Sequence, residues 1–379
     1  MSTSQLPLLI YANPEFVSDL YYLTGLMTPD PYILLQSGEQ TTIAVSPLEY
    51  GRAVKEARVD QVIDIATLSK RNEPLQAKGL SPEAATICNL LADQLLTQVQ
   101  VTRDFPFYLA EELRSTGVQL QPYPHAMLTQ RMLKSQEEVA HIRDSIRITQ
   151  CCLERVEQIL GEATIETGML KWNGDWLTSE VVHREIEQTC ICHNAMAGHP
   201  IVAGGDQACD PHERGHGVLY ANQLIIVDIF PRSKAHGYWG DLTRTFLKGK
   251  PTTEQTRLVK TVAEAQKRAI DAIASGSITG KIHAEVEAIF EREGYRTEQK
   301  NGTYQGFFHG TGHGFGLDIH EPPRLGKQQT LVLEAGMVVT VEPGLYYPGI
   351  GGCRIEDDVW VTQNGCEVLS DYPYGWILS

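Results

Sequence analysis

Leu224-Ile225-Ile226-Val227-Asp228-Ile229-Phe230 is the stretch that decides the fold of the larger part of this chain. Its run of β-branched and apolar residues predicts a buried strand. A turn is expected around Pro231–Lys234, and the composition of Tyr238–Phe246 predicts a strand that returns beside the first. The sequence therefore predicts an antiparallel hairpin whose strands are both largely buried.

Two aspartates lie in this predicted hairpin. If the turn is centred between Lys234 and Ala235, Asp228 lies opposite Asp241. Side chains directly opposite each other have Cβ atoms about 5 Å apart, and like charges at that separation destabilise a sheet. A cation between the two carboxylates removes the repulsion, so the pairing indicates a cation site.

A second predicted hairpin carries another acidic pair near the C-terminus. Met337–Glu342 and Arg354–Val361 are predicted strands, and Glu342 and Glu356 are symmetric about Gly349 in the turn between them. Acidic residues in strands most often point towards water, and that interpretation suffices for one pair. Here two pairs lie within apolar runs, where an unpaired buried carboxylate is costly. A metal site explains both pairs.

Between the hairpins lies the segment His309-Gly310-Thr311-Gly312-His313-Gly314-Phe315-Gly316-Leu317-Asp318-Ile319-His320-Glu321. A single histidine here would more often be a packed polar residue. Three histidines among glycines, which permit close approach of the backbone, favour a functional site instead. Four carboxylates and one imidazole form an oxygen-rich ligand set. Such a set suits paired Mn²⁺, Co²⁺ or Zn²⁺ better than a thiolate zinc site does.

A break separates these elements from the first part of the chain. Two prolines in Gln121–Pro124 disfavour both helix and central strand. Ser135 and Glu138 then form a predicted capping box, which opens an amphipathic helix that ends at Gly161. We therefore predict two domains, residues 1–125 and residues 133–379.

The order of predicted elements differs between the two domains. The first alternates strands, such as Tyr32–Gln36 and Gln61–Ile65, with helical stretches, which indicates a smaller α/β domain. The second has further helices predicted from a capping box at Thr252 to about Gly276, and over Lys281–Glu293, between strand-rich regions. This mixture predicts an α+β domain.

Composition and charge exclude several classes of function. The net charge of −15 argues against binding nucleic acid through its phosphates, and no apolar run is long enough to span a membrane. Met1–Ile10 has no basic residue before its apolar patch, so we expect no secretory signal. The 8 scattered cysteines are interpreted as reduced thiols of a cytoplasmic protein.

At this point the sequence resembles the pita-bread metallopeptidases, which include Xaa-Pro aminopeptidases, prolidases and methionine aminopeptidases. The resemblance covers the second domain throughout, and Tyr22–Gly25 resembles the family's creatinase-type N-terminal domain. It is most specific in the motifs Gly240-Asp-Leu-Thr-Arg-Thr-Phe246, His309 to Glu321, Val341-Glu-Pro-Gly-Leu-Tyr346 and Arg354-Ile-Glu-Asp-Asp358. The fold implied is a pita-bread catalytic domain preceded by a smaller α/β domain.

The resemblance also implies roles for individual residues. It implies five metal ligands, namely Asp228, Asp241, His313, Glu342 and Glu356. It places His212 and His320 beside the substrate. It places His309 in the pocket, and it implies that Arg354 and Tyr346 orient a metal-binding carboxylate. Glu342 is expected to act as general base as well as ligand.

The activity implied is hydrolysis of the Xaa-Pro bond at the N-terminus of short peptides by a water that bridges two divalent metal ions. Mn²⁺ is expected, with Co²⁺ or Zn²⁺ as alternatives. A dipeptidase (prolidase) is the alternative activity, and a pita-bread binding module without catalysis is a further one, disfavoured because all five ligands are present. A homodimer is expected, with the N-terminal domain closing one side of the pocket.

One departure from the family pattern is visible. Two more residues separate Asp228 from Asp241 than is usual, and Ile229–Ser233 replaces small residues. Two extra residues preserve the facing parity of a hairpin, so we expect the ligand pair to survive. Rival sites are weaker: Cys190–His193 lacks a second cysteine pair for a thiolate zinc site, and no Gly-x-Ser-x-Gly motif is present.

Overall fold

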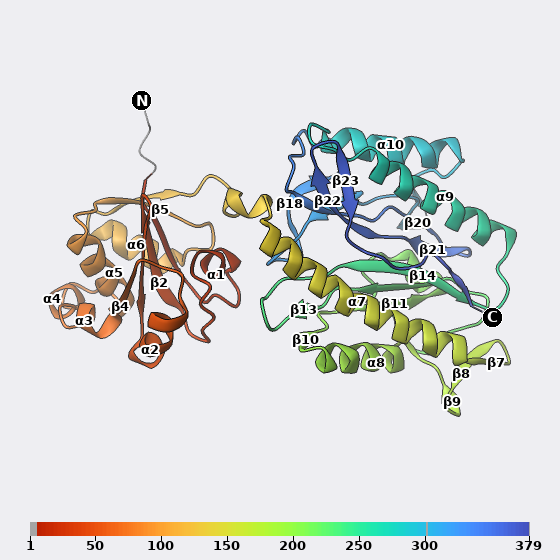
Figure 1. The fold of residues 1–379 in the computed structure, drawn as a ribbon, viewed down its shortest axis with the longest axis horizontal. Helices are drawn as coiled ribbons and strands as arrows, with labels where there is room; N and C mark the ends of the chain where they lie inside the picture. Colours follow the sequence, from red (N-terminus) through yellow and green to blue (C-terminus); the bar gives the residue numbers. More distant parts are fainter. Residues whose placement is uncertain (1–5, 301, 379) are drawn as a thin grey trace. The chain divides into compact units, whose positions relative to one another are not determined.

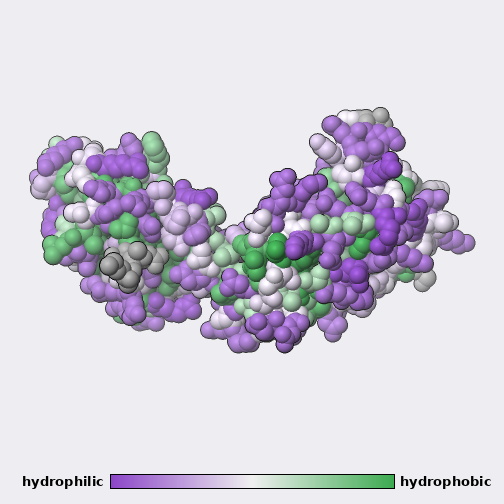
Figure 2. Space-filling model, turned by 90° about the horizontal axis from the view of Figure 1, so that it is seen from above, coloured by the Kyte–Doolittle hydropathy of each residue, from purple (hydrophilic) through white to green (hydrophobic). Residues whose placement is uncertain are grey.

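The computed structural model describes residues 6–300 and 302–378. The start of the predicted N-terminal domain, including half of Met1–Ile10, lies outside the described residues. The chain forms two compact units, Met1–Arg131 and Met132–Ser379. Of the helices described, none is both long and apolar enough to cross a membrane. Each unit has a mostly hydrophilic surface in the view of Figure 2, with smaller areas of hydrophobic residues.

The N-terminal unit is a mixed six-stranded sheet with the strand order β4-β3-β2-β1-β5-β6. Helices lie on both faces of this sheet (Figure 1). Its strands are β1 (Leu8–Ala12), β2 (Tyr32–Ser37), β3 (Gln40–Val45), β4 (Gln61–Asp64), β5 (Gln98–Val101) and β6 (Gln119–Pro122). Its helices are α1 (Ser18–Thr24), α2 (Pro47–Glu56), α3 (Ile65–Ser69), α4 (Glu73–Gln76), α5 (Pro82–Asp93) and α6 (Phe107–Ser115), and the short 3-10 helix η1 (Thr129–Met132) follows at the boundary.

Alternation along β1 explains why this sheet is covered on both faces. Leu9 packs in a core with α5 and α6, whereas Leu8 and Ile10 pack in a second core with α1 and α2. Successive side chains of a strand point to opposite faces, so an apolar strand such as β1 must be covered on both sides.

The C-terminal unit contains two larger sheets, β11-β12-β14-β24 and β18-β17-β19-β22-β23. The strands of these sheets are β11 (Ile201–Gly204), β12 (Ile225–Ile229), β14 (Leu242–Lys248), β17 (Gly312–Gly314), β18 (Glu321–Leu325), β19 (Val338–Val341), β22 (Asp357–Thr362), β23 (Gly365–Val368) and β24 (Ile377–Leu378). The remaining strands form small sheets: β7 (Thr164–Glu166), β8 (Met169–Trp172), β9 (Asp175–Trp176), β10 (Ala195–Met196), β13 (Arg232–Ser233), β15 (Glu298–Lys300), β16 (Thr303–Gln305), β20 (Gly344–Tyr347) and β21 (Gly351–Arg354).

Each larger sheet is covered by a pair of helices. The first pair, α7 (Gln136–Glu162) and α8 (Ser179–Cys192), shares a buried core with β11, β12 and β14. The second pair, α9 (Thr253–Asp271) and α10 (Thr279–Arg292), shares another core with β19 and β22. A 3-10 helix, η2 (Gly205–Cys209), follows β11. The helices leave one face of each sheet uncovered by either pair, and that face carries the polar residues described below.

Helix starts predicted from capping boxes are confirmed. Ser135 with Glu138 caps α7, and Thr252 with Gln255 caps α9, each with both reciprocal hydrogen bonds. The predicted end of the second helix near Gly276 is wrong, because α9 ends at Asp271. Ser277 Oγ donates to the Ala272 carbonyl oxygen at 2.8 Å. A side chain therefore provides the hydrogen bond for a carbonyl group just after the last helical turn.

The predicted pairing of the first hairpin is wrong in register. Asp228 lies opposite Thr243, and the paired part of β14 begins at Leu242, so Asp241 precedes the ladder. The connection is not a simple turn, since Arg232–Ser233 forms β13 and pairs with β10. The shift is by two residues, which preserves the face on which each side chain lies.

The predicted pairing of the second hairpin is confirmed. Gly344 lies opposite Arg354 in β20–β21, and Val341 lies opposite Asp357 in β19–β22. Both ladders share one register, and Glu342 and Glu356 occupy the matching positions between them.

Candidate metal centre

Alternation along the strands turns the acidic side chains away from the helices. Val227 and Ile229 of β12 pack in the core with α7 and α8, so Asp228 lies on the other face. In the second sheet Val339 and Val341 pack beneath α9 and α10, which leaves Glu342 on the uncovered face. The period of two thus gathers acids on one face from two separate sheets.

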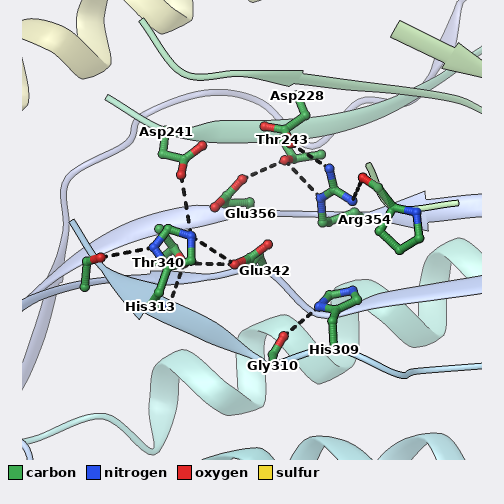
Figure 3. A network of polar contacts seen from close by, with 12 residues as sticks. Asp228, Asp241, Thr243, His309, Gly310, His313, Thr340, Glu342, Arg354 and Glu356 are labelled. Atoms are coloured by element: carbon green, nitrogen blue, oxygen red, sulfur yellow. Dashed lines mark hydrogen bonds and ion pairs between the residues drawn. The ribbon is translucent and has the colours of Figure 1, made fainter. Parts of the chain in front are cut away.

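Four of the five predicted ligands form a tight group. Figure 3 shows the side chains of Asp241, Glu342 and Glu356 and the ring of His313 turned towards a common space. Ligand atoms of Asp241, His313 and Glu356 all lie within 4.8 Å of one another. His313 Nε2 is 3.3 Å from Glu342 Oε1 and 3.8 Å from Asp241 Oδ2.

The imidazole of His313 is held by a contact on its other nitrogen. Its Nδ1 lies 3.1 Å from the Gly314 carbonyl oxygen, which places the proton on Nδ1 and leaves the Nε2 lone pair facing the carboxylates. The residues on either side of His313 must be glycines, because neighbouring backbone leaves no room for a side chain. A Cβ on Gly312 would lie 1.9 Å from the Thr340 carbonyl oxygen, and one on Gly314 would lie 2.3 Å from the Pro322 carbonyl oxygen.

Asp228, the fifth predicted ligand, is oriented by an arginine. Arg354 Nη2 donates to Asp228 Oδ2 at 2.6 Å, and both side chains are buried. The other oxygen, Oδ1, is buried without a hydrogen-bond partner among the described residues. An orphaned carboxylate oxygen beside other carboxylates is costly unless a cation takes that position.

Two threonines orient the glutamates. Thr243 Oγ1 donates to Glu356 Oε2 at 2.6 Å, and Thr340 Oγ1 lies 3.3 Å from Glu342 Oε1. Sequence reasoning did not identify either threonine. The period of two could have found both, since Thr243 and Thr340 each lie two residues from a predicted ligand on the same strand face.

Burial of so many carboxyl groups changes their proton affinity. Desolvation, followed by the charges of Glu356 and Asp228, raises the pKa of Asp241 well above its usual value. Desolvation likewise raises the pKa of Glu356 well above its usual value, and that of Glu342 to about 7. For His313 burial acts in the opposite sense and lowers the pKa to about 3, so its ring is neutral near pH 7.

The residues of this cluster fit divalent metal ions. Their donors are carboxylate oxygens and one neutral imidazole, the groups that bind Mn²⁺, Co²⁺ and Zn²⁺. The unpartnered Oδ1 of Asp228 and the mutual repulsion of the buried carboxylates both favour a cation in the common space.

The two histidines expected beside the substrate lie in the same cavity as the cluster. This cavity has a volume of about 680 Å³, and His212 and His320 both line it. The His320 ring stands edge-on to His313 with centroids 4.5 Å apart. Desolvation and the nearby Arg324 lower the pKa of His320, so its ring is neutral near pH 7.

His309 and Tyr346 form a chain of contacts that ends on Arg354. The Tyr346 hydroxyl lies 2.8 Å from His309 Nε2 and accepts from Arg354 Nη1 at 3.1 Å. His309 Nδ1 lies 2.7 Å from the Gly310 carbonyl oxygen. Both ring nitrogens of His309 are therefore engaged within the protein, and its ring contributes to the wall of the cavity.

A buried ion pair that sequence reasoning missed supports the loop that carries His320. Lys134, just before α7, lies 2.6 Å from Glu321 Oε2, and both side chains are buried. Glu321 Oε1 also accepts from the Asp318 backbone N–H at 3.0 Å. A Cβ on Gly316 would lie 2.8 Å from the Lys134 ammonium, so glycine makes room for the pair. No spacing rule links Lys134 to Glu321, which are 187 positions apart.

Arg324 was also missed. It lies opposite His313 in the β17–β18 ladder and lines the cavity of about 680 Å³. Among the residues that the structure describes it forms no ion pair within 4.0 Å. Its guanidinium is therefore available to an anionic group in the cavity. The local sequence Pro322-Pro323-Arg324 contains no motif that indicates this role.

Much of the C-terminal unit matches a known metallopeptidase family. The model of metallopeptidase family M24 matches residues 140–363, more than half of the chain. An uncharacterized peptidase of Staphylococcus aureus strain MSSA476 is 35% identical over 245 residues, which is 64% of this chain and 63% of that protein. An uncharacterized peptidase of Staphylococcus epidermidis is 33% identical over 243 residues, with the same shares of each chain. The match thus spans less than two thirds of the length of these curated relatives.

Solved structures are similar over nearly the whole chain. The prolidase from Pyrococcus horikoshii OT3 has a TM-score of 0.77 and 26% identity, and it covers 98% of this chain and 95% of its own. The prolidase from Pyrococcus furiosus has a TM-score of 0.76 and 25% identity, with 98% and 97% covered. The X-Pro aminopeptidase from Thermotoga maritima MSB8, at 23% identity and a TM-score of 0.79, shows the fold alone. These matches confirm the predicted α+β class and pita-bread fold.

Proposed function

We propose that this chain, which belongs to metallopeptidase family M24, hydrolyses the bond between the first residue of a short peptide and a proline that follows it. The observation that carries the proposal is the group of Asp241, His313 and Glu356 around one space in a cavity of about 680 Å³. The solved relatives at 25% identity or more that are named above are prolidases, which supports proline as the second residue.

The ligand set that we propose consists of Asp228, Asp241, His313, Glu342 and Glu356. The bound ions are two divalent metals, with Mn²⁺ favoured by the oxygen-rich donors and Co²⁺ or Zn²⁺ as alternatives. When bound, such ions would polarise the peptide carbonyl and would lower the pKa of a water molecule towards neutral pH.

Glu342 is the residue that moves the proton in this proposal. It lines the cavity, and its Oε1 lies 3.3 Å from His313 Nε2, so its carboxylate is within reach of a water molecule in the common space. We propose that Glu342 accepts a proton from the attacking water and delivers it to the proline nitrogen. That nitrogen leaves as an amine, so it needs the proton when the bond breaks.

His212 and His320 stabilise the charge that develops on the carbonyl oxygen. Both line the cavity, and the His320 ring contacts that of His313. The hydrogen bond from a ring N–H to this oxygen is strongest in the tetrahedral transition state, where the negative charge on the oxygen is greatest. Arg354 supports the reaction indirectly, because it holds Asp228 and the Tyr346 hydroxyl.

A second candidate is an Xaa-Pro dipeptidase, and Arg324 is the observation that favours it. Its guanidinium lines the same cavity without an ion pair from the described residues. The carboxylate of a dipeptide lies one residue beyond the cleaved bond, and an arginine can bind it through two hydrogen bonds. An Arg324→Met variant is expected to raise KM for dipeptides more than for longer peptides.

The experiment that tests the proposal is hydrolysis of a peptide panel by the purified full-length protein. The panel contains Xaa-Pro dipeptides, Xaa-Pro-Yaa tripeptides and Met-Xaa peptides without proline, each with added Mn²⁺, Co²⁺ or Zn²⁺. We expect cleavage of the Xaa-Pro peptides. Exclusive cleavage of Met-Xaa peptides would replace the proposal with a methionine aminopeptidase.

A further inference from the structure

A second cavity, of about 950 Å³, adjoins the one that contains the acidic cluster. The two cavities share the lining residues Phe308, His309, Gly310 and Gly326, so they are contiguous. Residues of α10 and of the segment that follows it line the second cavity. No role in the mechanism above requires this space.

Arg296 is the basic residue of the second cavity that remains available to a ligand. Lys327, the other basic residue of the lining, lies 3.3 Å from Glu287, whereas Arg296 forms no ion pair within the part of the chain that the structure describes. Glu291, a further acidic residue of the lining, lies in the last turn of α10 and is exposed.

The backbone that carries Arg296 is held in place. Tyr347 donates its hydroxyl to the Arg296 carbonyl oxygen at 2.8 Å. The next residue, Thr297, donates its Oγ1 to the Phe307 carbonyl oxygen at 2.8 Å and accepts from the Phe307 N–H at 3.0 Å. The fixed backbone limits the positions that the Arg296 guanidinium can reach.

The two cavities meet along the segment from Arg324 to Lys327. Arg324 lines the first cavity, Gly326 lines both, and Lys327 lines the second. Gly326 has no side chain, and the atoms nearest to its Cβ position belong to Gln329 and Gly310, both at 3.9 Å.

We propose that the second cavity binds the C-terminal part of peptides longer than a dipeptide, and that Arg296 binds their terminal carboxylate. The inference rests on the proposed Xaa-Pro peptidase function and extends it to substrate length. Two arginines then sort substrates, since the carboxylate of a dipeptide binds at Arg324 and that of a longer peptide at Arg296. A charge-assisted contact of this kind changes affinity by about tenfold or more.

The test compares free-acid and C-terminally amidated peptides of the series Xaa-Pro-Ala, Xaa-Pro-Ala-Ala and Xaa-Pro-Ala-Ala-Ala with the full-length, metal-loaded protein. At the length that reaches Arg296, the wild type is expected to cleave the acid with a kcat/KM about tenfold above that of the amide. Arg296→Ala should abolish this preference. Arg292→Ala is the matched control, because Arg292 is paired with Glu264 and lies outside the cavity lining.

The outcomes separate the inference from the function on which it rests. Equal cleavage of acids and amides by the wild type at every length, or an unchanged preference in Arg296→Ala, would overturn the role of Arg296. Loss of the preference in Arg292→Ala as well would also overturn it, because the effect would then not be specific to the cavity. Absence of cleavage for every Xaa-Pro peptide would overturn the proposed function and this inference together.

Discussion

At the scale of single residues, the centre is organised by buried charge that the protein itself only partly neutralises. Arg354 compensates Asp228, and threonines orient Glu342 and Glu356, but Asp241 lies among carboxylates with its pKa raised well above the usual value. Without a cation, protons must occupy some of these groups. Metal binding and proton release are therefore expected to be coupled.

That coupling can be measured. In the metal-free protein near pH 7 the carboxyl groups with raised pKa values hold protons, whereas His313, with its pKa lowered to about 3, is already neutral. Mn²⁺ binding is expected to release protons at pH 6.5, to release fewer at pH 8, and to be weaker at the lower pH. Calorimetric titrations in two buffers of different protonation enthalpy count these protons. Proton uptake, or no exchange at either pH, would contradict the assignment.

His320 offers a test of charge stabilisation apart from metal binding. His320→Ala should retain its metals while kcat falls by about 10²-fold or more, as for loss of an oxyanion donor. Metal content and kcat with an Xaa-Pro peptide are the two measurements. His216→Ala is the control, because His216 is exposed and lies outside the cavity. Turnover near that of the wild type in His320→Ala would make His320 a packing residue.

At the scale of helices and strands, the sequence predicted those features that depend on contacts between residues close together in the chain. Capping boxes marked the starts of α7 and α9 because both partners lie within one helical turn. The second hairpin was predicted in register because β20 and β21 are joined by a short turn. The first failed because β13 leaves the hairpin to pair with β10, a contact that hairpin arithmetic does not include. The acids still share a face, since the error was an even number of residues.

The pair of Lys134 and Glu321 joins the start of α7 to the loop that carries His320, and its removal should be costly. Breaking a buried ion pair leaves an uncompensated charge, so Lys134→Met is expected to lower the free energy of unfolding by about 3–5 kcal/mol. Chemical denaturation measures the change. The control Arg147→Met breaks an exposed pair with Asp144 and should cost less than about 1 kcal/mol.

A double variant separates the stability of this pair from its effect on His320. Lys134→Met with Glu321→Met removes both charges and is expected to recover much of the lost stability. Its kcat should be lower than that of the wild type, because the bond from the Asp318 N–H to Glu321 is also lost and the loop is held less well. A kcat equal to that of the wild type in the double variant, or a cost below about 1 kcal/mol for Lys134→Met alone, would contradict this role.

At the scale of the whole molecule, the sequence predicted the fold because its specific motifs lie on elements that the fold requires. The acid-bearing strands and the glycine-rich histidine segment belong to the two sheets covered by α7–α8 and α9–α10. Arg324, Arg296 and Lys134 could not be predicted, because their importance depends on which cavities and partners the folded chain brings to them. The homodimer remains a prediction.

The most direct test of the central claim is the metal dependence of Xaa-Pro hydrolysis by the purified protein. After removal of metal by a chelator, the wild type is expected to be inactive and to regain activity as Mn²⁺, Co²⁺ or Zn²⁺ is added, up to about two ions per chain by elemental analysis. Asp241→Asn, measured beside it, should bind less metal and stay inactive. Full activity of the metal-free protein, or full metal occupancy in Asp241→Asn, would contradict the account.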